Sequence, residues 1–405
     1  MADKAKIQRS DKAKWTVMVY MAGDNNLDGA ALRDIEEMAR VGSTKDVNCL
    51  VQLDRLEDRK TRRFLITQGG GYKRDCLETF GETNTGDPKV LEDFLLWSAE
   101  RYPAERYFLT LWNHGSGWWE ETGSRVAARR IPDARLRCSA TRSSLFCHKT
   151  DTPDRTAHRS ICYDDHSGGD ALDNRELKDV LTRGCTVIGK KIDILGMDAC
   201  LMTMVEVAWQ LRDTVEIIVG SEIEEPDDGW PYAEILRFLT VKPKSKTHIV
   251  AKEVVKRYIA SYRDEGETVT QSAINTAATS EIINALNPLV EELLFNLNEN
   301  RKLIHWAWDR TPKFYDDNYL DLYAFARKLR GKDKGRISDK AEAVTAALTT
   351  GKDKAILCQG KLGREVTGTK GLSIYFPAVR INPAYRGLDF AADCRWAAFL
   401  ERVLG

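Results

Sequence analysis

The stretch KIDILGMDACLM, residues 191–202, contains a run that is typical of a buried strand, followed by two potentially reactive side chains, Asp198 and Cys200. Its apolar run ends in Asp198, Cys200 follows two residues later, and an apolar, helix-like pattern then begins. Short apolar runs of this kind are typical of strands that are covered on both faces. We therefore predict a strand over 191–200 and a helix over 201–213, with Cys200 at their junction.

The chain on either side of this stretch alternates between strand and helix patterns. Apolar runs predict core strands at 15–22, 48–54, 106–115 and 215–222, and a hairpin strand at 62–68. Amphipathic patterns predict helices at 28–42, 87–102 and 172–184. Because strands that alternate with helices form parallel, doubly wound sheets, we expect an α/β fold.

The second half of the chain is richer in helix. Helical periodicity covers 245–263, 279–300, 318–331 and 338–350, and further strands are predicted at 268–276, 354–359 and 371–377. We expect one α/β core over 14–240, interrupted by a long Arg-rich insertion at about 120–160. The remaining part, 241–405, is expected to be helix-rich, to add strands and to pack on the core.

Composition excludes several classes of partner and location. The 405 residues include 61 basic and 61 acidic side chains, which gives no electrostatic reason to bind nucleic acid or an anionic membrane. The first residues are polar, and no window approaches the roughly 18 apolar residues of a membrane span. The nine cysteines contain no C-x-x-C pair. We expect a cytoplasmic protein with mostly free thiols.

Four polar clusters follow predicted strands. They are GDNN at 23–26, NHGSGW at 113–118, MDAC at 197–200 and SEIEEPDDGW at 221–230. Ligands bind at the carboxyl ends of strands in an open parallel sheet, so these clusters are expected to share one edge.

His114 and Cys200 are the reactive pair that this edge offers. His114 ends its strand before Gly115, on a bend where we expect an exposed imidazole. A helix that starts at Cys200 would favour the thiolate, and a nearby imidazolium would lower the thiol pKa further. Taken alone, Cys200 is more simply a buried thiol; beside His114 it is a candidate nucleophile.

These residues stand in stretches that resemble the clostripain family of cysteine peptidases, a caspase-like family in the same clan as legumain and gingipain. The matching stretches are WTVMVYMAGDNNLD (15–28), LTLWNHGSGW (109–118), CYDDHSGGDALDNRELKDVL (162–181), IDILGMDACLMTMVEVA (192–208), VGSEIEEPDDGWPY (219–232) and GLSIYFP (371–377). The resemblance implies a caspase-like αβα sandwich around a mostly parallel sheet, with a Cys-His dyad.

The resemblance also implies a role for each site residue. Cys200 would attack the scissile carbonyl, His114 would act as general acid and then base, and the N–H groups of Cys200 and Gly115 would form the oxyanion hole. Asp198 would lie at the base of the S1 pocket and pair with a basic P1 residue, Arg before Lys, because a guanidinium makes a bidentate contact. The second acid would be Asp228 or Asp227, although both also fit a solvated turn.

The insertion suggests how such an enzyme is switched on. We expect a zymogen that is cut in the 120–160 loop, by itself or by an upstream protease. A flexible Arg-rich loop suits an Arg-specific enzyme; the alternative is a basic, solvated loop without a regulatory role. The candidate cleavage residues are Arg125, Arg129, Arg130, Arg135, Arg137 and Arg142.

The sequence also fits two other functions: a regulatory or binding module with a vestigial dyad, or a transpeptidase-like acyl-transfer enzyme. No cofactor is required, although the family resemblance allows for Ca²⁺. Asp24, Asn26 and Asp28 imitate an EF-hand loop, but Ile35 takes the twelfth position, where a Glu is needed, so we assign no metal site. Expected partners are protein or peptide substrates with Arg at P1.

Overall fold

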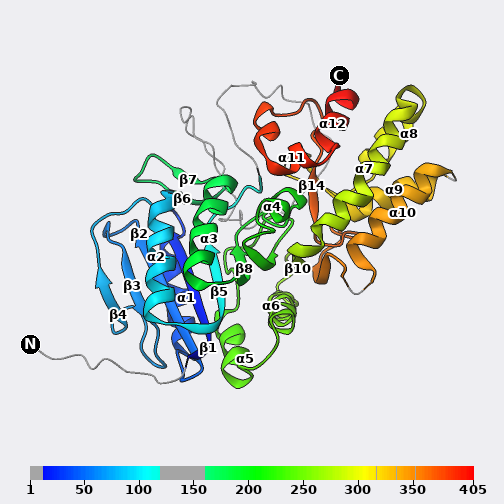
Figure 1. Cartoon of the computed structure of the whole chain (residues 1–405). Coiled ribbons are helices and arrows are strands. Elements are labelled where there is room, and N and C mark those ends of the chain that lie inside the picture. Colours follow the sequence, from blue (N-terminus) through cyan, green and yellow to red (C-terminus); the bar gives the residue numbers. More distant parts are fainter. Residues whose placement is uncertain (1–11, 119–159, 316, 334, 352) are drawn as a thin grey trace, which may run out of the picture.

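The computed structural model describes residues 12–118 and 160–405, apart from 316, 334 and 352. Its main element is one mixed sheet of nine strands in the order β13-β10-β9-β8-β5-β1-β2-β3-β4 (Figure 1). In chain order they are β1 (Ala13–Gly23), β2 (Val47–Arg55), β3 (Arg62–Leu65), β4 (Cys76–Thr79), β5 (Ala104–Trp112), β8 (Ile192–Asp198), β9 (Val215–Gly220), β10 (Val269–Asn275) and β13 (Ile356–Leu362).

The five central strands, β9, β8, β5, β1 and β2, run parallel, and both edges of the sheet are antiparallel. The strands β2 and β8 are buried along their whole length, and β1 is buried at every residue except Lys14, as is typical of strands covered on both faces. The predicted α/β class with a mostly parallel central sheet is therefore confirmed, and the predicted hairpin is β3–β4.

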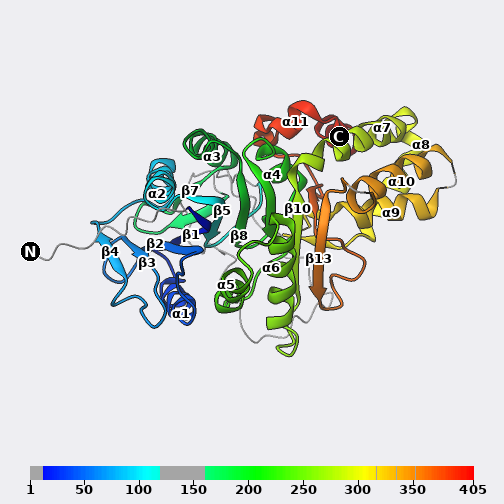
Figure 2. The same ribbon diagram turned by 60° about the horizontal axis from the view of Figure 1, so that its bottom comes forward.

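Helices cover both faces of the sheet (Figure 2). One face carries α2 (Pro88–Arg101), α3 (Asn174–Ile188) and α4 (Val205–Gln210), and the other carries α1 (Asp28–Ala39), α5 (Tyr232–Val241) and α6 (Thr247–Ser261). The ends of α3 show why these residues form a helix. Asp173 and Glu176 make a reciprocal capping box at its start, and Gly189 adopts a φ of 80° at its end.

The C-terminal part extends the sheet with β10 and β13 and adds the remaining helices. These are α7 (Thr279–Phe295), α8 (Leu297–Asp309), α9 (Leu322–Lys332), α10 (Arg336–Thr349), α11 (Asp389–Asp393) and α12 (Trp396–Leu404). A small sheet of β11 (Lys313–Phe314), β12 (Tyr319–Asp321) and β14 (Ser373–Tyr375) packs on the loops that follow β5 and β8. The Tyr319 hydroxyl donates to Ser116 O at 2.7 Å, and Ser373 N donates to Thr203 O at 3.0 Å.

Three sequence predictions need correction. The helix predicted from residue 201 begins only at Val205, because residues 201–204 pair with neighbouring backbone: Leu201 N donates to Ile223 O and Thr203 N to Ser221 O. The helix predicted over 279–300 is two helices that meet at Asn296, and β12 occupies the start of the helix predicted over 318–331.

A short hairpin that the sequence did not predict lies beside the carboxyl ends of the central strands. It consists of β6 (Ile161–Asp164) and β7 (Asp170–Leu172). The backbone of Gly115 pairs with Ile161 in an isolated antiparallel bridge, so β6 is held against the loop after β5.

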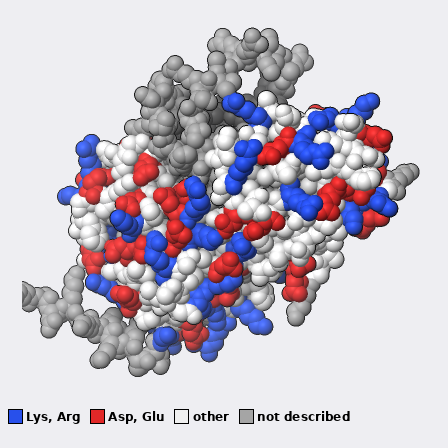
Figure 3. Space-filling view, turned by 45° about the horizontal axis from the view of Figure 1, so that its top comes forward, with Lys and Arg blue, Asp and Glu red and all other residues white. Residues whose placement is uncertain are grey.

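Charges of both signs are interspersed on the molecular face that Figure 3 shows, in keeping with the balanced composition. Among the described residues, no helix has the length and apolar character needed to cross a membrane. All but the last residue of the insertion predicted at about 120–160, together with all six of its candidate arginines, falls within 119–159, outside the described residues.

Candidate active site

The loops after β5 and β8 touch each other at the carboxyl edge of the sheet. Trp112 and Asp198, the last residues of the two strands, are register partners, and Asn113 N donates to Asp198 O at 3.2 Å. A Cβ atom added to Gly115 would lie only 2.5 Å from the carbonyl oxygen of Cys200. The histidine loop and the cysteine loop are therefore in contact through a position where only glycine fits.

His114 lies inside this contact and is 1% exposed, so the prediction of an exposed imidazole was wrong. Tyr163 of β6 covers the ring, with the two ring centroids 6.3 Å apart and nearly perpendicular. The Nε2 atom of His114 is 2.7 Å from Oδ1 of Asn26, which follows β1. Asn26 thus orients the imidazole, as such partners commonly do.

Cys200 is fully buried, and its thiol lies under the segment that follows β9. The backbone N–H of Glu225 donates to Sγ of Cys200 at 3.2 Å. Leu201 adopts a φ of 67°, a strained value for a side chain branched at Cγ, and this turns the chain away before α4 starts. The helix N-terminus that we expected to stabilise a thiolate therefore does not lie at Cys200.

Asp198 is also fully buried, at the end of β8. Its Oδ2 accepts hydrogen bonds from the Tyr232 hydroxyl at 2.7 Å and from Trp230 N at 3.3 Å. Burial raises the pKa of Asp198 to about 6, against the lowering effect of its hydrogen bonds to Tyr232, Glu225 and Trp230. With a pKa of about 6, most of this carboxyl group is ionised at neutral pH.

Among the acids of the segment 221–230, the structure singles out Glu225. It is buried beside Asp198, and burial, followed by repulsion from Asp198, raises its pKa well above the usual range. Glu225 therefore holds a proton and donates it to Asp198. Of the two acids predicted from the sequence, Asp227 is half-buried and Asp228 is exposed, both in a turn closed by the bond from Gly229 N to Pro226 O.

The turn itself packs against Asp198. A Cβ atom on Gly229 would lie 3.1 Å from Oδ1 of Asp198, and the Tyr262 hydroxyl holds the carbonyl of Gly229 at 2.8 Å. The predicted Asp198 and the Asp227–Asp228 turn are thus neighbours, although the carboxyl group that faces Asp198 belongs to Glu225.

Sequence reasoning missed Asn26, Glu225 and Tyr232. The GDNN and SEIEEPDDGW clusters were signals for the first two, because both follow core strands. Nothing in the sequence distinguishes the buried Glu225 from the exposed Glu224. The hydroxyl of Tyr232 carried no sequence signal, because an aromatic residue at the start of a helix is common.

A mostly parallel sheet between two helical layers, with these loops at its carboxyl edge, defines a caspase-like α/β protein. Solved structures share this fold. A secreted C11 cysteine protease from Bacteroides thetaiotaomicron, in complex with an irreversible peptide inhibitor, is 19% identical, with a TM-score of 0.66 over 95% of this chain and 99% of that chain. An inactive zymogen C11 protease from Parabacteroides distasonis is 18% identical, with a TM-score of 0.67 over the same shares.

The chain belongs to the clostripain family, whose model matches residues 19–131 and 148–402. Clostripain of Hathewaya histolytica is 29% identical over 235 residues, which are 51% of this chain and 38% of that protein. The matched region thus spans less than half the length of this relative. The family resemblance inferred from the sequence is confirmed. The cytoplasmic location stays a prediction, as does the expectation that no cofactor is required although the resemblance allows for Ca²⁺.

Proposed function

We propose that this protein is a cysteine endopeptidase that cleaves after basic residues, with Arg preferred over Lys at P1. One observation carries the proposal: the loop with His114 and the loop with Cys200 are in contact at Gly115, beside a buried Asp198. A thiol, an imidazole and a carboxylate on neighbouring strand ends are the groups that such a reaction needs.

In the proposed reaction, His114 takes the thiol proton, and Sγ of Cys200 forms a bond to the scissile carbonyl carbon. The carbonyl oxygen becomes an oxyanion, which the N–H groups of Cys200 and Gly115 stabilise. His114 then protonates the leaving amine as the C–N bond breaks, which leaves an acyl-enzyme. A water molecule, deprotonated by His114, attacks the thioester and releases the carboxylic acid and the thiol.

The P1 residue is proposed to meet Asp198, with Glu225 as the second acid. Above a pH of about 6 the Asp198 carboxylate is ionised, and a buried, hydrogen-bonded anion favours a guanidinium that can bond to both of its oxygens. Glu225 supplies the proton that keeps Asp198 anionic. In this assignment Asp227 and Asp228 belong to a turn at the rim of the proposed P1 pocket.

Peptide cleavage tests the function and the specificity together. We expect Cys200→Ala to abolish cleavage of peptides with Arg at P1. Asp198→Asn is expected to lower kcat/KM for these peptides by on the order of 100-fold, because a buried charge pair is lost. The exposed Asp228→Asn is the matched control and should retain most of the activity; a larger loss in Asp228→Asn than in Asp198→Asn would contradict this assignment.

We further propose that the protein is made as a zymogen. The full burial of Cys200 and His114 supports this, because a substrate must reach both side chains. Cleavage within 120–160, after Arg125, Arg129, Arg130, Arg135, Arg137 or Arg142, is the proposed trigger. Mass spectrometry of the wild-type chain and of Cys200→Ala distinguishes self-cleavage from cleavage by another protease. Cleavage of the wild type but not of Cys200→Ala indicates self-cleavage. If neither chain is cleaved, activation needs an upstream protease.

A further inference from the structure

Two buried polar atoms behind the proposed P1 site have no hydrogen-bond partner among the residues that the structure describes. They are the amide oxygen Oε1 of Gln271, in β10, and the hydroxyl oxygen of Tyr258, in α6. Both side chains are fully buried. A polar atom that is buried without a partner destabilises the folded state, so each one calls for an explanation. Such groups are retained mainly at functional sites, where a ligand supplies the missing partner.

Both atoms lie beside the acids that the P1 residue is proposed to meet. The Nε2 group of Gln271 donates to Oε1 of Glu225 at 3.4 Å, which fixes the amide next to this acid. Burial, followed by the nearby charge of Glu225, raises the pKa of Tyr258 well above its usual range. Asp198 and Cys200 also contribute to this shift, so the hydroxyl lies within electrostatic reach of the nucleophile and of both acids.

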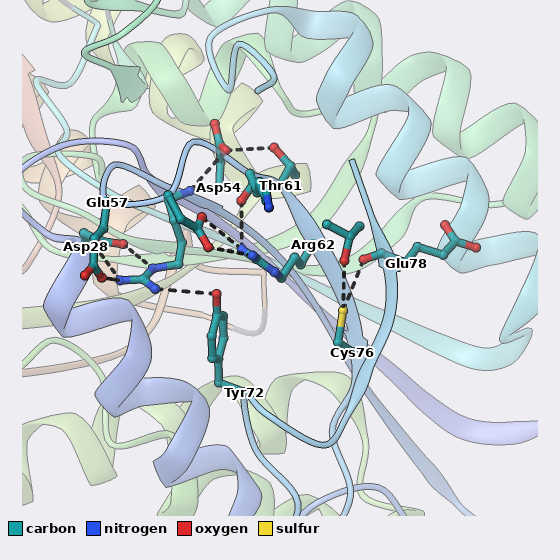
Figure 4. Close-up of polar contacts among 12 residues, drawn as sticks. Asp28, Asp54, Glu57, Thr61, Arg62, Tyr72, Cys76 and Glu78 are labelled. Atoms are coloured by element: carbon teal, nitrogen blue, oxygen red, sulfur yellow. Dashed lines mark hydrogen bonds and ion pairs between the residues drawn. The ribbon is translucent and has the colours of Figure 1, made fainter. Parts of the chain in front are cut away.

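Two buried arginines of this protein show which groups hold a guanidinium in its interior. The guanidinium of Arg55 donates to both carboxylate oxygens of Asp28 at 2.7 Å and to the Tyr72 hydroxyl at 3.5 Å (Figure 4). The Nε group of Arg63 donates to the amide oxygen of Gln52 at 2.8 Å. In each case a neutral oxygen, from a tyrosine or a glutamine, accepts one of the five N–H groups. Tyr and Gln are also the two residue types whose oxygens lack partners beside the P1 site.

We propose that Gln271 and Tyr258 determine specificity by accepting hydrogen bonds from the guanidinium of a P1 arginine that is paired with Asp198. A bidentate contact with Asp198 uses two of the five N–H groups, and the other three must also be satisfied once water is excluded. A P1 lysine is shorter and has three donors on one nitrogen, so it depends less on these two oxygens. This inference rests on the proposed function, because it concerns how the P1 residue of a substrate is chosen.

Gln271 and Tyr258 lie on regular elements of the C-terminal part. The strand β10 pairs with β9 on one side and with β13 on the other, which fixes the backbone of Gln271. The ring of Tyr258 packs against that of Tyr262, with the ring centroids 5.0 Å apart. Neither residue belongs to the segment 221–230, which carries Glu225 and must move when the buried site opens. The two oxygens therefore keep their places during opening, as a specificity site requires.

The test compares the activated enzyme on two fluorogenic peptides that differ only in Arg or Lys at P1. Tyr258→Phe removes the hydroxyl alone, and Gln271→Met removes the amide at nearly constant side-chain length. Each variant should lower kcat/KM for the Arg peptide on the order of tenfold, because a hydrogen bond to a charged group is lost. For the Lys peptide we expect a loss of less than about threefold, so the ratio of the two kcat/KM values falls.

Tyr323→Phe in α9 and Gln359→Met in β13 change half-buried residues of the same types and are the matched controls; both should keep the wild-type ratio. Without substrate, Tyr258→Phe should have a Tm equal to or above that of the wild type, since its hydroxyl has no partner to lose. A lower Tm, or equal losses on the Arg and Lys peptides, would overturn the inference. An unchanged ratio in an enzyme that cleaves the Arg peptide overturns this inference alone, whereas a wild type that cleaves neither peptide overturns the proposed function.

Discussion

Gly115→Ala is the sharpest test of the contact on which the site depends. The added methyl would lie 2.5 Å from the carbonyl oxygen of Cys200 and 3.0 Å from Cβ of Ala199. An ordinary contact needs about 3.4 Å or more, so the two loops must separate by close to 1 Å along this line. A misplacement of about 1 Å in a reacting group can cost about 100-fold in rate. We expect kcat for an Arg-P1 peptide to fall by that order, with KM changed much less.

The assay is hydrolysis of a fluorogenic peptide by the activated enzyme, with active sites counted by alkylation of Cys200. Gly331→Ala is the control, because a methyl group there meets nothing within 4 Å and the residue lies in α9. Circular dichroism should show that both variants are folded. If Gly115→Ala keeps activity within about threefold of Gly331→Ala, the two loops do not need this contact, and the geometric basis of the proposal fails.

Three further outcomes are expected. Asn26→Ala should lower kcat on the order of tenfold at unchanged KM, since His114 loses the partner of its Nε2; an unchanged kcat would show that Asn26 does not orient the ring. Glu225→Ala should move the acid limb of kcat/KM for Arg peptides to a pH above about 6, because Asp198 loses a hydrogen bond that lowers its pKa, whereas Glu225→Gln should leave the limb in place. Burial raises the pKa of Glu206 to about 7, so this group contributes stability below pH ~4.5 that is lost as the pH rises through ~7, roughly 3 kcal/mol in all. In urea unfolding, Glu206→Gln should therefore lose less stability than the wild type between pH 5 and 8, and parallel profiles would contradict the assignment.

The main sheet could be predicted because each core strand has a local signal. The runs at 15–22, 48–54 and 106–115 are rich in apolar and β-branched residues, and each coincides with a largely buried strand of the structure. Their order along the chain, with helices between them, implies parallel pairing and places the polar clusters at one edge. For the same reason the sequence alone could place the loop of His114 beside the loop of Cys200, and the two loops are in contact at Gly115.

The details of the site could not be predicted, because they depend on contacts between distant segments. Residues 201–204 have helical periodicity, but they pair with 221–223 and with Ser373 instead, so tertiary pairing overrides the local pattern. Burial of His114 depends on Tyr163, whose strand has only four residues and is too short to show a clear period. The alternation that buries Glu222 and Glu225 and exposes Glu224 follows from packing against β10, which lies about 50 residues away.

The late start of α4 changes how Cys200 can be activated. With the helix beginning at Val205, the dipole acts five residues away from the thiol, and such effects fade within one turn. In the proposed mechanism, stabilisation of the thiolate must then come from the His114 imidazolium and from backbone donors such as Glu225 N, which donates to Sγ. Because Glu225 also holds the proton beside Asp198, one residue of the segment after β9 contacts both the nucleophile and the proposed specificity acid. A movement of this segment, as opening of a buried site requires, would therefore change the reactivity of Cys200 and the charge of the P1 pocket together.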